Sequence, residues 1–206
     1  MTPLLAPLMP LSLLCPPLLV ALSCWVSPRF GRCAFLTTAG AAAVTFIAWS
    51  VLGNSTTGMQ SGMLESDALE RIMVMAVSGV GLLASILSWT FMGPHAQTSR
   101  AVRRYFVSFN LFLAAICAIP LMADVAVTWI VIELTTLASV LLVSHSETRA
   151  SIEAAWKYAI ITLTGSSIAL LGFLILYACE AHAGTNTFTW ALLQHTFSMI
   201  SLNTVV

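Results

Sequence analysis

Residues 125–144 read VAVTWIVIELTTLASVLLVS, a stretch in which Glu133 is the one charged side chain. A helix that crosses the hydrocarbon core of a bilayer needs about 20 predominantly apolar residues. The apolar residues do not alternate with polar ones as in a barrel strand, and open strands cannot cross lipid because their unpaired backbone groups are too costly. The stretch therefore predicts a membrane-spanning helix with a single carboxyl group inside it.

Further apolar stretches on both sides of this one predict an all-α bundle of about six membrane-spanning helices. The predicted spans are residues 4–26, 34–52, 72–92, 105–122, 125–144 and 152–178. The first stretch lacks the positively charged start of a signal peptide and is rich in proline, which predicts a retained and kinked helix. Residues 180–206 are more polar, and we expect them to form a non-cytoplasmic tail that leads towards a missing seventh helix.

The composition agrees with a membrane protein and argues against several soluble classes. Of the 206 residues 59% are apolar and 8% are charged, whereas a soluble domain has about 45–50% and about 25%. Eight basic residues balance eight acidic ones, so there is no basic surface for nucleic acid. The cysteines and histidines are not spaced as metal, iron–sulfur or haem ligands. We expect no catalytic residue, no cofactor and no metal in this chain, and a lipid bilayer as its surroundings.

The basic residues predict the orientation of the bundle. With six spans, one side carries one basic residue, Arg71, and the loops of the other side carry Arg29, Arg32, Arg100, Arg103, Arg104 and Arg149. Cytoplasmic loops are enriched in Lys and Arg. The N-terminus is therefore expected to lie outside the cytoplasm.

Glu133 is the first candidate functional residue, because it lies about 12 Å into its span at 1.5 Å per residue. A carboxyl group near the bilayer centre costs on the order of 2.5–3.5 kcal/mol, which a partner, water or protonation must offset. Burial and a nearby cation act on such a group in opposite directions, and this competition favours a switchable proton site. The alternative is a glutamate that only hydrogen-bonds a neighbouring helix, although Asn or Gln would do so at lower cost.

Lys157 is the second candidate, and it is the one lysine of the chain. It lies about 8 Å into the last span. A lysine at that depth can serve a proton relay, but it can also extend to the interface or pair with Glu153 four residues earlier. From the residues alone the two interpretations weigh equally. The hairpin of consecutive spans predicts a water-bridged contact between Lys157 and Glu133, near a hydrated path lined by Thr135, Thr136, Thr162 and Ser166, with Thr164 and Ser167 close by.

Residues 103–177 resemble the antiporter-like, proton-translocating membrane subunits of NADH–quinone oxidoreductase, membrane-bound hydrogenases and Mrp-type sodium/proton antiporters. Within that family the likeness is greatest to the component F type of hydrogenase-4. The stretches that carry the resemblance are Ile132-Glu-Leu-Thr-Thr-Leu, Ser151-Ile-Glu-Ala-Ala-Trp-Lys-Tyr-Ala-Ile-Ile and Gly172-Phe-Leu-Ile-Leu-Tyr-Ala. The first two contain Glu133 and Lys157.

The resemblance implies that Glu133 corresponds to a glutamate essential for proton translocation and that Lys157 corresponds to a lysine on the sixth helix. It further implies a redox-driven complex in the bacterial inner membrane, with other membrane and redox subunits as partners and the electron carriers outside this chain. Full family members contain two inverted repeats, so we expect a truncated or split protein holding part of one half-channel. The alternatives are a component of a sodium/proton antiporter without redox partners and a non-transporting structural fragment.

Overall fold

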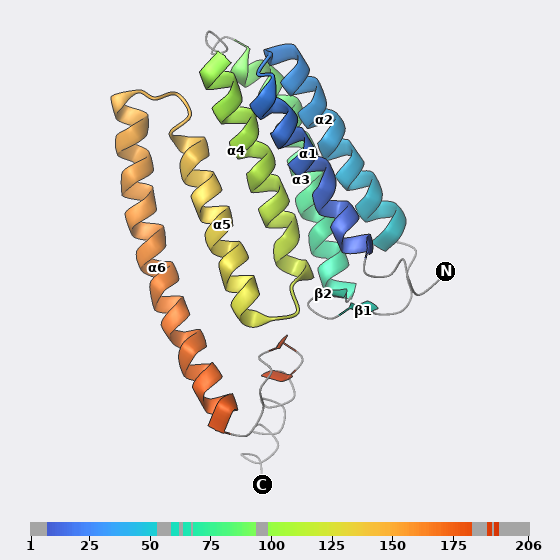
Figure 1. Cartoon of the computed structure of the whole chain (residues 1–206), viewed down its shortest axis with the longest axis vertical. Helices are drawn as coiled ribbons and strands as arrows, with labels where there is room; N and C mark the ends of the chain where they lie inside the picture. The colour runs from blue at the N-terminus through green and yellow to red at the C-terminus, as the bar shows by residue number, and fades with distance from the viewer. Residues whose placement is uncertain are drawn as a thin grey trace.

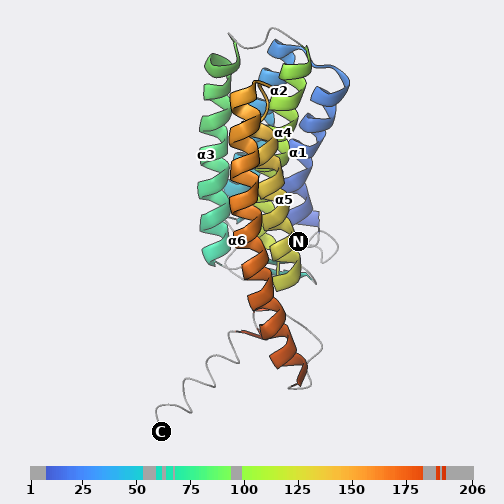
Figure 2. The same ribbon diagram turned by 90° about the vertical axis from the view of Figure 1, so that its left-hand side faces the viewer.

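The computed structural model is a bundle of long antiparallel helices (Figure 1 and Figure 2), which confirms the predicted all-α membrane fold. It describes residues 8–52, 59–61, 64–66, 68–93, 99–182, 189–190 and 192–193. The helices are α1 (Leu8–Val26), α2 (Phe30–Ile47), α3 (Ala68–Met92), α4 (Ser99–Ala118), α5 (Val125–Val143) and α6 (Arg149–His182).

Four short elements lie at one end of the bundle or close to it. A π-helical turn, η1 (Ala48–Leu52), continues α2, and a 3-10 turn, η2 (Ile119–Leu121), continues α4. A small antiparallel hairpin of β1 (Met59–Ser61) and β2 (Leu64–Ser66) precedes α3, with Met59 opposite Ser66. The sequence did not predict this hairpin, because three-residue strands leave no hydrophobic periodicity to detect.

Five helices in the described residues are long and apolar enough to cross a membrane, and α1 adds a shorter apolar helix, Ser12–Val26. The five segments are Phe30–Ser50, Ile72–Met92, Ser99–Leu121, Val125–Val143 and Arg149–Ala178. Several helices extend beyond the apolar stretches that predicted them. The clearest case is α4, which begins at Ser99 rather than at residue 105, because arginines in its first turns are good helix formers. The start of the predicted span 4–26 falls partly outside the described residues.

The core of the bundle lies around α4, which packs against α1, α2, α3 and α5. Phe106 and Leu113 of α4 are buried against apolar side chains of the first three helices. Asn110 is fully buried, and its Nδ2 donates to Thr37 Oγ1 of α2 at 2.9 Å. Similar hydrogen bonds join other pairs of helices, including Ser88 to Tyr105 at 2.8 Å between α3 and α4. Such bonds stabilise membrane helix contacts by about 0.6 kcal/mol each, rising to about 1.7 kcal/mol.

Helices α1 and α2 approach closely at Gly40, which is buried. A Cβ atom at this position would lie 2.9 Å from Cγ2 of Val20 and 3.8 Å from the carbonyl oxygen of Pro16, both on α1. On other helices, Gly79, Gly165 and Gly172 have no atom within 4 Å of such a Cβ. Of these four glycines, Gly40 is therefore the one that a neighbouring helix in this chain requires to be small.

The helix ends that flank the three basic loops lie together at one end of the bundle (Figure 1). Arg104 of α4 forms an ion pair with Glu147 in the α5–α6 loop, and the Arg103 guanidinium lies 5.0 Å from the centre of the Trp25 ring of α1. His145 of the same loop lies against Tyr105, with 5.4 Å between ring centres. These contacts gather the basic residues on one side, the arrangement on which the predicted orientation depends; we call it the basic-loop end.

The opposite end of α5 is held by a capping residue and by part of the C-terminal region. Asp124 Oδ1 accepts a hydrogen bond from Val127 N–H at 3.0 Å, as an N-cap does. Trp190 donates its backbone N–H to Ala123 O at 3.2 Å, and Leu193 is buried against Val125. The rest of the predicted tail, residues 183–188, 191 and 194–206, lies outside the described residues.

Candidate proton-carrying site between α5 and α6

Glu133 lies on the face of α5 that meets α6, and its side chain is half-buried. Its Oε2 accepts a hydrogen bond from Ser166 Oγ of α6. One turn earlier on α5, Trp129 donates from Nε1 to the carbonyl oxygen of Ser166 at 3.2 Å. Residues four apart lie on one face of a helix, so Trp129 and Glu133 together bind both the hydroxyl and the carbonyl of Ser166. The carboxyl group is thereby positioned at a defined level of the bundle.

The short loop between α5 and α6 makes this pairing possible. Residues 144–148 reverse the chain, and Glu147 adopts a positive φ of 54° there. Thr148 Oγ1 then accepts a hydrogen bond from Ser151 N–H at 3.1 Å, as in an N-terminal cap of α6. The tight reversal places α6 antiparallel to α5, and α6 continues beyond the start of α5 (Figure 1).

Lys157 lies on α6 but not beside Glu133. Its Nζ is 2.5 Å from Glu153 Oε1, and the two side chains are 68% and 66% exposed. Because Tyr158 pairs with Ser139, Lys157 lies near the level of Ser139, about 10 Å along the helix axis from Glu133 at 1.5 Å per residue. The structure therefore places the two candidate residues on neighbouring helices, at different depths, and gives Lys157 the intrahelical partner that the sequence offered as an alternative.

Of the four predicted path residues, Ser166 is the one whose side chain is hydrogen-bonded to Glu133 in the described structure. The other three donate to carbonyl oxygens of their own helices, as hydroxyls commonly do. Thr135 donates to Val131 O at 2.9 Å, Thr136 to Ile132 O at 3.2 Å and Thr162 to Tyr158 O at 2.8 Å. These three threonines therefore satisfy their hydroxyl groups locally and do not form a continuous chain to Glu133.

Three residues that join α5 to α6 were not predicted from the sequence: Trp129, Ser139 and Tyr158. Tyr158 and Ser139 have their hydroxyl oxygens 3.1 Å apart. A usable signal was present, since Tyr158, Thr162 and Ser166 recur every four residues and therefore share one face of α6. The indole of Trp129 carried no such signal, because a tryptophan near a span end is also typical of the membrane interface.

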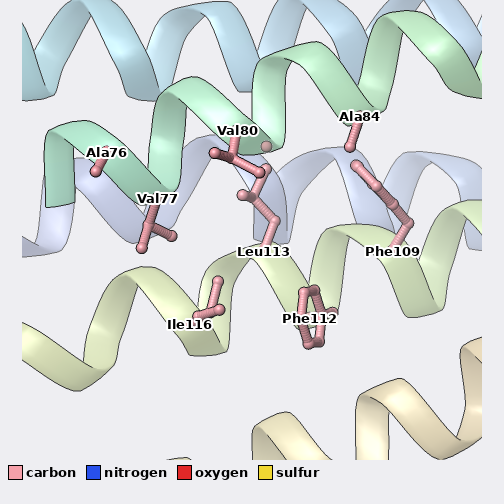
Figure 3. Close-up of a pocket in the computed structure, with 9 residues that line it drawn as sticks. Ala76, Val77, Val80, Ala84, Phe109, Phe112, Leu113 and Ile116 are labelled. Carbon is pink, nitrogen blue, oxygen red and sulfur yellow. The ribbon is translucent and has the colours of Figure 1, made fainter. Parts of the chain in front are cut away.

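In the described part of the chain, no cluster of metal-binding side chains adjoins this site. Among those residues, no group of three or more His, Cys, Asp and Glu side chains is arranged to hold a metal ion. A cavity of about 280 Å³ lies between α3 and α4 (Figure 3), away from Glu133. Its lining is apolar and includes Ala76, Val77, Val80, Phe112 and Leu113. It therefore offers no proton-carrying group.

Residues 122–206, which contain α5 and α6, match the family model described as NADH:quinone oxidoreductase/Mrp antiporter, TM. This match confirms the resemblance to the antiporter-like membrane subunits. The matched region contains Glu133, Ser166, Tyr158 and Lys157, and it begins just before α5.

Three curated proteins are similar to the chain at low identity. A hydrogenase-4 component F homolog of Methylacidiphilum infernorum (isolate V4) is 25% identical over 138 residues, covering 61% of this chain and 29% of the relative. Hydrogenase-4 component B of Escherichia coli (strain K12) is 27% identical over 113 residues, covering 55% and 16%. A Na(+)/H(+) antiporter subunit of Alkalihalophilus pseudofirmus is 29% identical over 112 residues, covering 54% and 14%. The chain spans less than a third of the length of each relative.

Proposed function

We propose that this chain is part of a proton-translocating membrane subunit. The proposal starts from the match of residues 122–206 to the membrane domain of the antiporter-like family. Its partners are other membrane and redox subunits of a hydrogenase-4 or NADH–quinone oxidoreductase type of complex in a bacterial inner membrane. The chain supplies six helices, with the N-terminus outside the cytoplasm, and no electron carrier.

The observation that carries this proposal is the Glu133 carboxylate held by Ser166 between two membrane helices. A carboxyl group at this depth is costly, and here it is half-buried and accepts a hydrogen bond from a hydroxyl group. Taking up a proton from one side and releasing it to the other is the chemistry that such a group performs. We therefore assign the role of proton carrier to Glu133, which lies between α5 and α6 within the region that matches the family model.

Lys157 influences Glu133 through its field rather than by contact. Two unit charges about 10 Å apart interact by on the order of 1–2 kcal/mol at an effective dielectric constant near 20. The nearby Glu153 carboxylate cancels most of this field while the ion pair is closed. Opening the Lys157–Glu153 pair would therefore change the electrostatic potential at Glu133. Through this change, a conformational change elsewhere in the complex drives proton uptake or release.

The proposal is tested with inverted membrane vesicles of the source organism, which contain the chain together with its native partners. A pH-sensitive dye reports proton uptake after addition of hydrogen, formate or NADH. We expect one of these donors to drive uptake that disappears when the gene for this chain is deleted and returns when it is restored. Uptake that is identical with and without the chain, for all three donors, contradicts the proposal.

A second candidate function is sodium/proton exchange without redox partners, and the similarity to the Na(+)/H(+) antiporter of Alkalihalophilus pseudofirmus favours it. In the same vesicles an imposed pH gradient would then collapse on addition of sodium, and the collapse would depend on this chain. Chain-dependent collapse by sodium, with no response to electron donors, would replace the redox-driven function by the exchange function.

Replacing Lys157 with Met is expected to lower proton uptake by about tenfold, the factor that corresponds to losing a coupling of about 1.4 kcal/mol. The methionine keeps an unbranched side chain of similar length and removes the charge. Donor-driven uptake per amount of assembled protein is the measurement. Arg149→Met is the matched control, because it removes a positive charge from the same helix near its start. Equal uptake by the Lys157→Met variant and the native chain would mean that Lys157 only forms the ion pair with Glu153 and has no part in proton uptake.

Replacing Ser166 with Ala is expected to slow proton uptake by about tenfold, since a hydrogen bond to a charged group contributes about 1.5–3 kcal/mol. The matched control is Ser167→Ala, because Ser167 Oγ donates to Leu163 O of its own helix at 2.8 Å instead. We expect the control to retain native uptake. A comparable loss in both variants would indicate a general disturbance of α6 rather than a role of Ser166 at Glu133.

A further inference from the structure

A second pair of hydroxyl groups joins α5 to α6 on the basic-loop side of Glu133. The Tyr158 hydroxyl oxygen lies 3.1 Å from Ser139 Oγ. Ser139 donates its own proton to Thr136 O at 2.7 Å. Because a hydroxyl carries a single proton, Tyr158 is the donor in this arrangement and Ser139 the acceptor. The Tyr158 proton therefore points towards Ser139 of α5, and the Ser139 proton points to a carbonyl oxygen three residues nearer to Glu133 along that helix.

Tyr158 lies on the same face of α6 as the residue that binds Glu133. Tyr158, Thr162 and Ser166 follow at intervals of four residues, and Ser166 donates a hydrogen bond to Glu133. Ser139 is six residues from Glu133 on α5, which corresponds to a rise of about 9 Å along the helix axis. Hydrogen-bonded oxygens lie about 2.8 Å apart, so a minimum of about two water molecules is needed to span this rise.

The charged neighbours of Tyr158 favour a hydrated site. Lys157 and Glu153 form an ion pair at the same level of α6, and both side chains are exposed. Two charged groups at this level bring water to the phenol hydroxyl. Dry packing does not require a hydroxyl here, since a phenylalanine would fill the same space. A hydroxyl that can both accept and donate is what proton transfer through hydrogen bonds requires.

We propose that Tyr158, acting with Ser139, is the relay through which protons pass between the basic-loop end and Glu133. The inference rests on the proposed function. A hydronium ion on the basic-loop side gives a proton to the Tyr158 oxygen, while the original Tyr158 proton passes to Ser139 Oγ. The Ser139 hydroxyl then turns from Thr136 O to a water between the helices and passes its proton to that water, and a chain of about two such waters delivers a proton to the Glu133 carboxylate. Each hydroxyl and each water accepts one proton and releases one, so the carboxylate is the one group that changes its charge.

The test compares Tyr158→Phe with Tyr177→Phe in the vesicle assay, with the complete chain and its native partners. Both substitutions remove one phenol hydroxyl from α6, but residue 177 lies beyond Ser166, on the far side of Glu133 from the basic-loop end. We expect Tyr158→Phe to lower proton uptake per assembled protein by about tenfold or more, the lower range for a lost proton-transfer group. Tyr177→Phe is expected to keep native uptake. Uptake by the native chain should also slow in D2O, and this slowing should be smaller for Tyr158→Phe once proton entry bypasses the relay.

A pair of Ser139 variants keeps the proposal testable if Tyr158→Phe accumulates poorly. Ser139→Ala is expected to reduce uptake as Tyr158→Phe does, and Ser139→Thr, which restores a hydroxyl, is expected to recover it. Equal uptake by the Ala and Thr variants overturns the relay. Native uptake by Tyr158→Phe, while Glu133→Gln has none, also overturns the relay but leaves the proposed function intact. Native uptake by Glu133→Gln overturns the proposed function itself.

Discussion

Replacing Glu133 with Gln is expected to abolish proton uptake in vesicles while the chain accumulates and assembles at near-native levels. Glutamine has the same shape, and its amide oxygen can still accept the hydrogen bond from Ser166. The packing of α5 on α6 is therefore preserved. What is lost is the capacity to bind and release a proton, because an amide does not ionise at any relevant pH. The expected effect is a fall to the background of the deletion strain, measured with the pH-sensitive dye.

Two further glutamate variants make this experiment specific. Glu147→Gln is the matched control, since Glu147 lies in the α5–α6 loop and pairs with Arg104, an exposed ion pair that contributes about 1 kcal/mol or less. It should retain native uptake. Glu133→Asp keeps the acid but shortens the side chain away from Ser166, so we expect partial uptake. Full uptake by Glu133→Gln would mean that Glu133 only hydrogen-bonds the neighbouring helix. It would support the alternative that this chain has a structural role and does not itself transport protons.

Replacing Gly40 with Leu is expected to lower the stability of the bundle. The new Cβ would lie 2.9 Å from Val20 Cγ2, and the rest of the side chain would have to enter the α1–α2 contact. Val20 is itself buried, and the neighbouring turn of α1 contains Pro16 and Pro17, whose φ angles are restricted. Overpacking of this kind costs about 1–3 kcal/mol, and more when the backbone cannot shift. The expected result is a lower denaturation midpoint in a titration with sodium dodecyl sulfate and a lower amount of chain in the membrane.

The same substitution at Gly79 is the control for this prediction. Gly79 also lies within a membrane-spanning helix, but a Cβ there meets no atom within 4 Å. We expect Gly79→Leu to change stability by about 0.5 kcal/mol or less. A midpoint for Gly40→Leu equal to that of Gly79→Leu would mean that α1 does not pack against α2 at Gly40 as the structure shows.

The number and order of the long helices follow from hydropathy, because length and apolar composition alone select a helix in a bilayer. The stretch around Glu133 shows this directly, since its predicted limits of 125–144 and those of α5 differ by one residue. The extended start of α4 and the β1–β2 hairpin were not predictable in this way. They depend on helix propensity at the membrane surface and on local pairing, and neither changes the mean hydropathy of a stretch.

The candidate site was predictable in its residue types but not in its pairs. The cost of an isolated carboxyl group identifies Glu133, and the spacing of Glu153 and Lys157 suggests their ion pair, which the structure contains. Which α6 hydroxyl meets Glu133 depends on the rotation of α6 about its axis. That rotation follows from the length of the 144–148 loop and from Trp129 binding the Ser166 carbonyl. No pattern in the sequence encodes it, and for this reason Thr135, Thr136 and Thr162 seemed equivalent to Ser166.

The position of α6 at the edge of the bundle has a mechanical consequence (Figure 1). The first four helices are joined by buried side chains and by several interhelical hydrogen bonds, whereas α6 is attached chiefly through α5. Elements with few buried contacts open at a lower free energy than the core does. A small change in the tilt of α6 would separate Ser166 from Glu133 without repacking α1–α4. Among the described helices α6, which carries Ser166 and Lys157, is thus the one that can move with the least disturbance of the rest of the bundle.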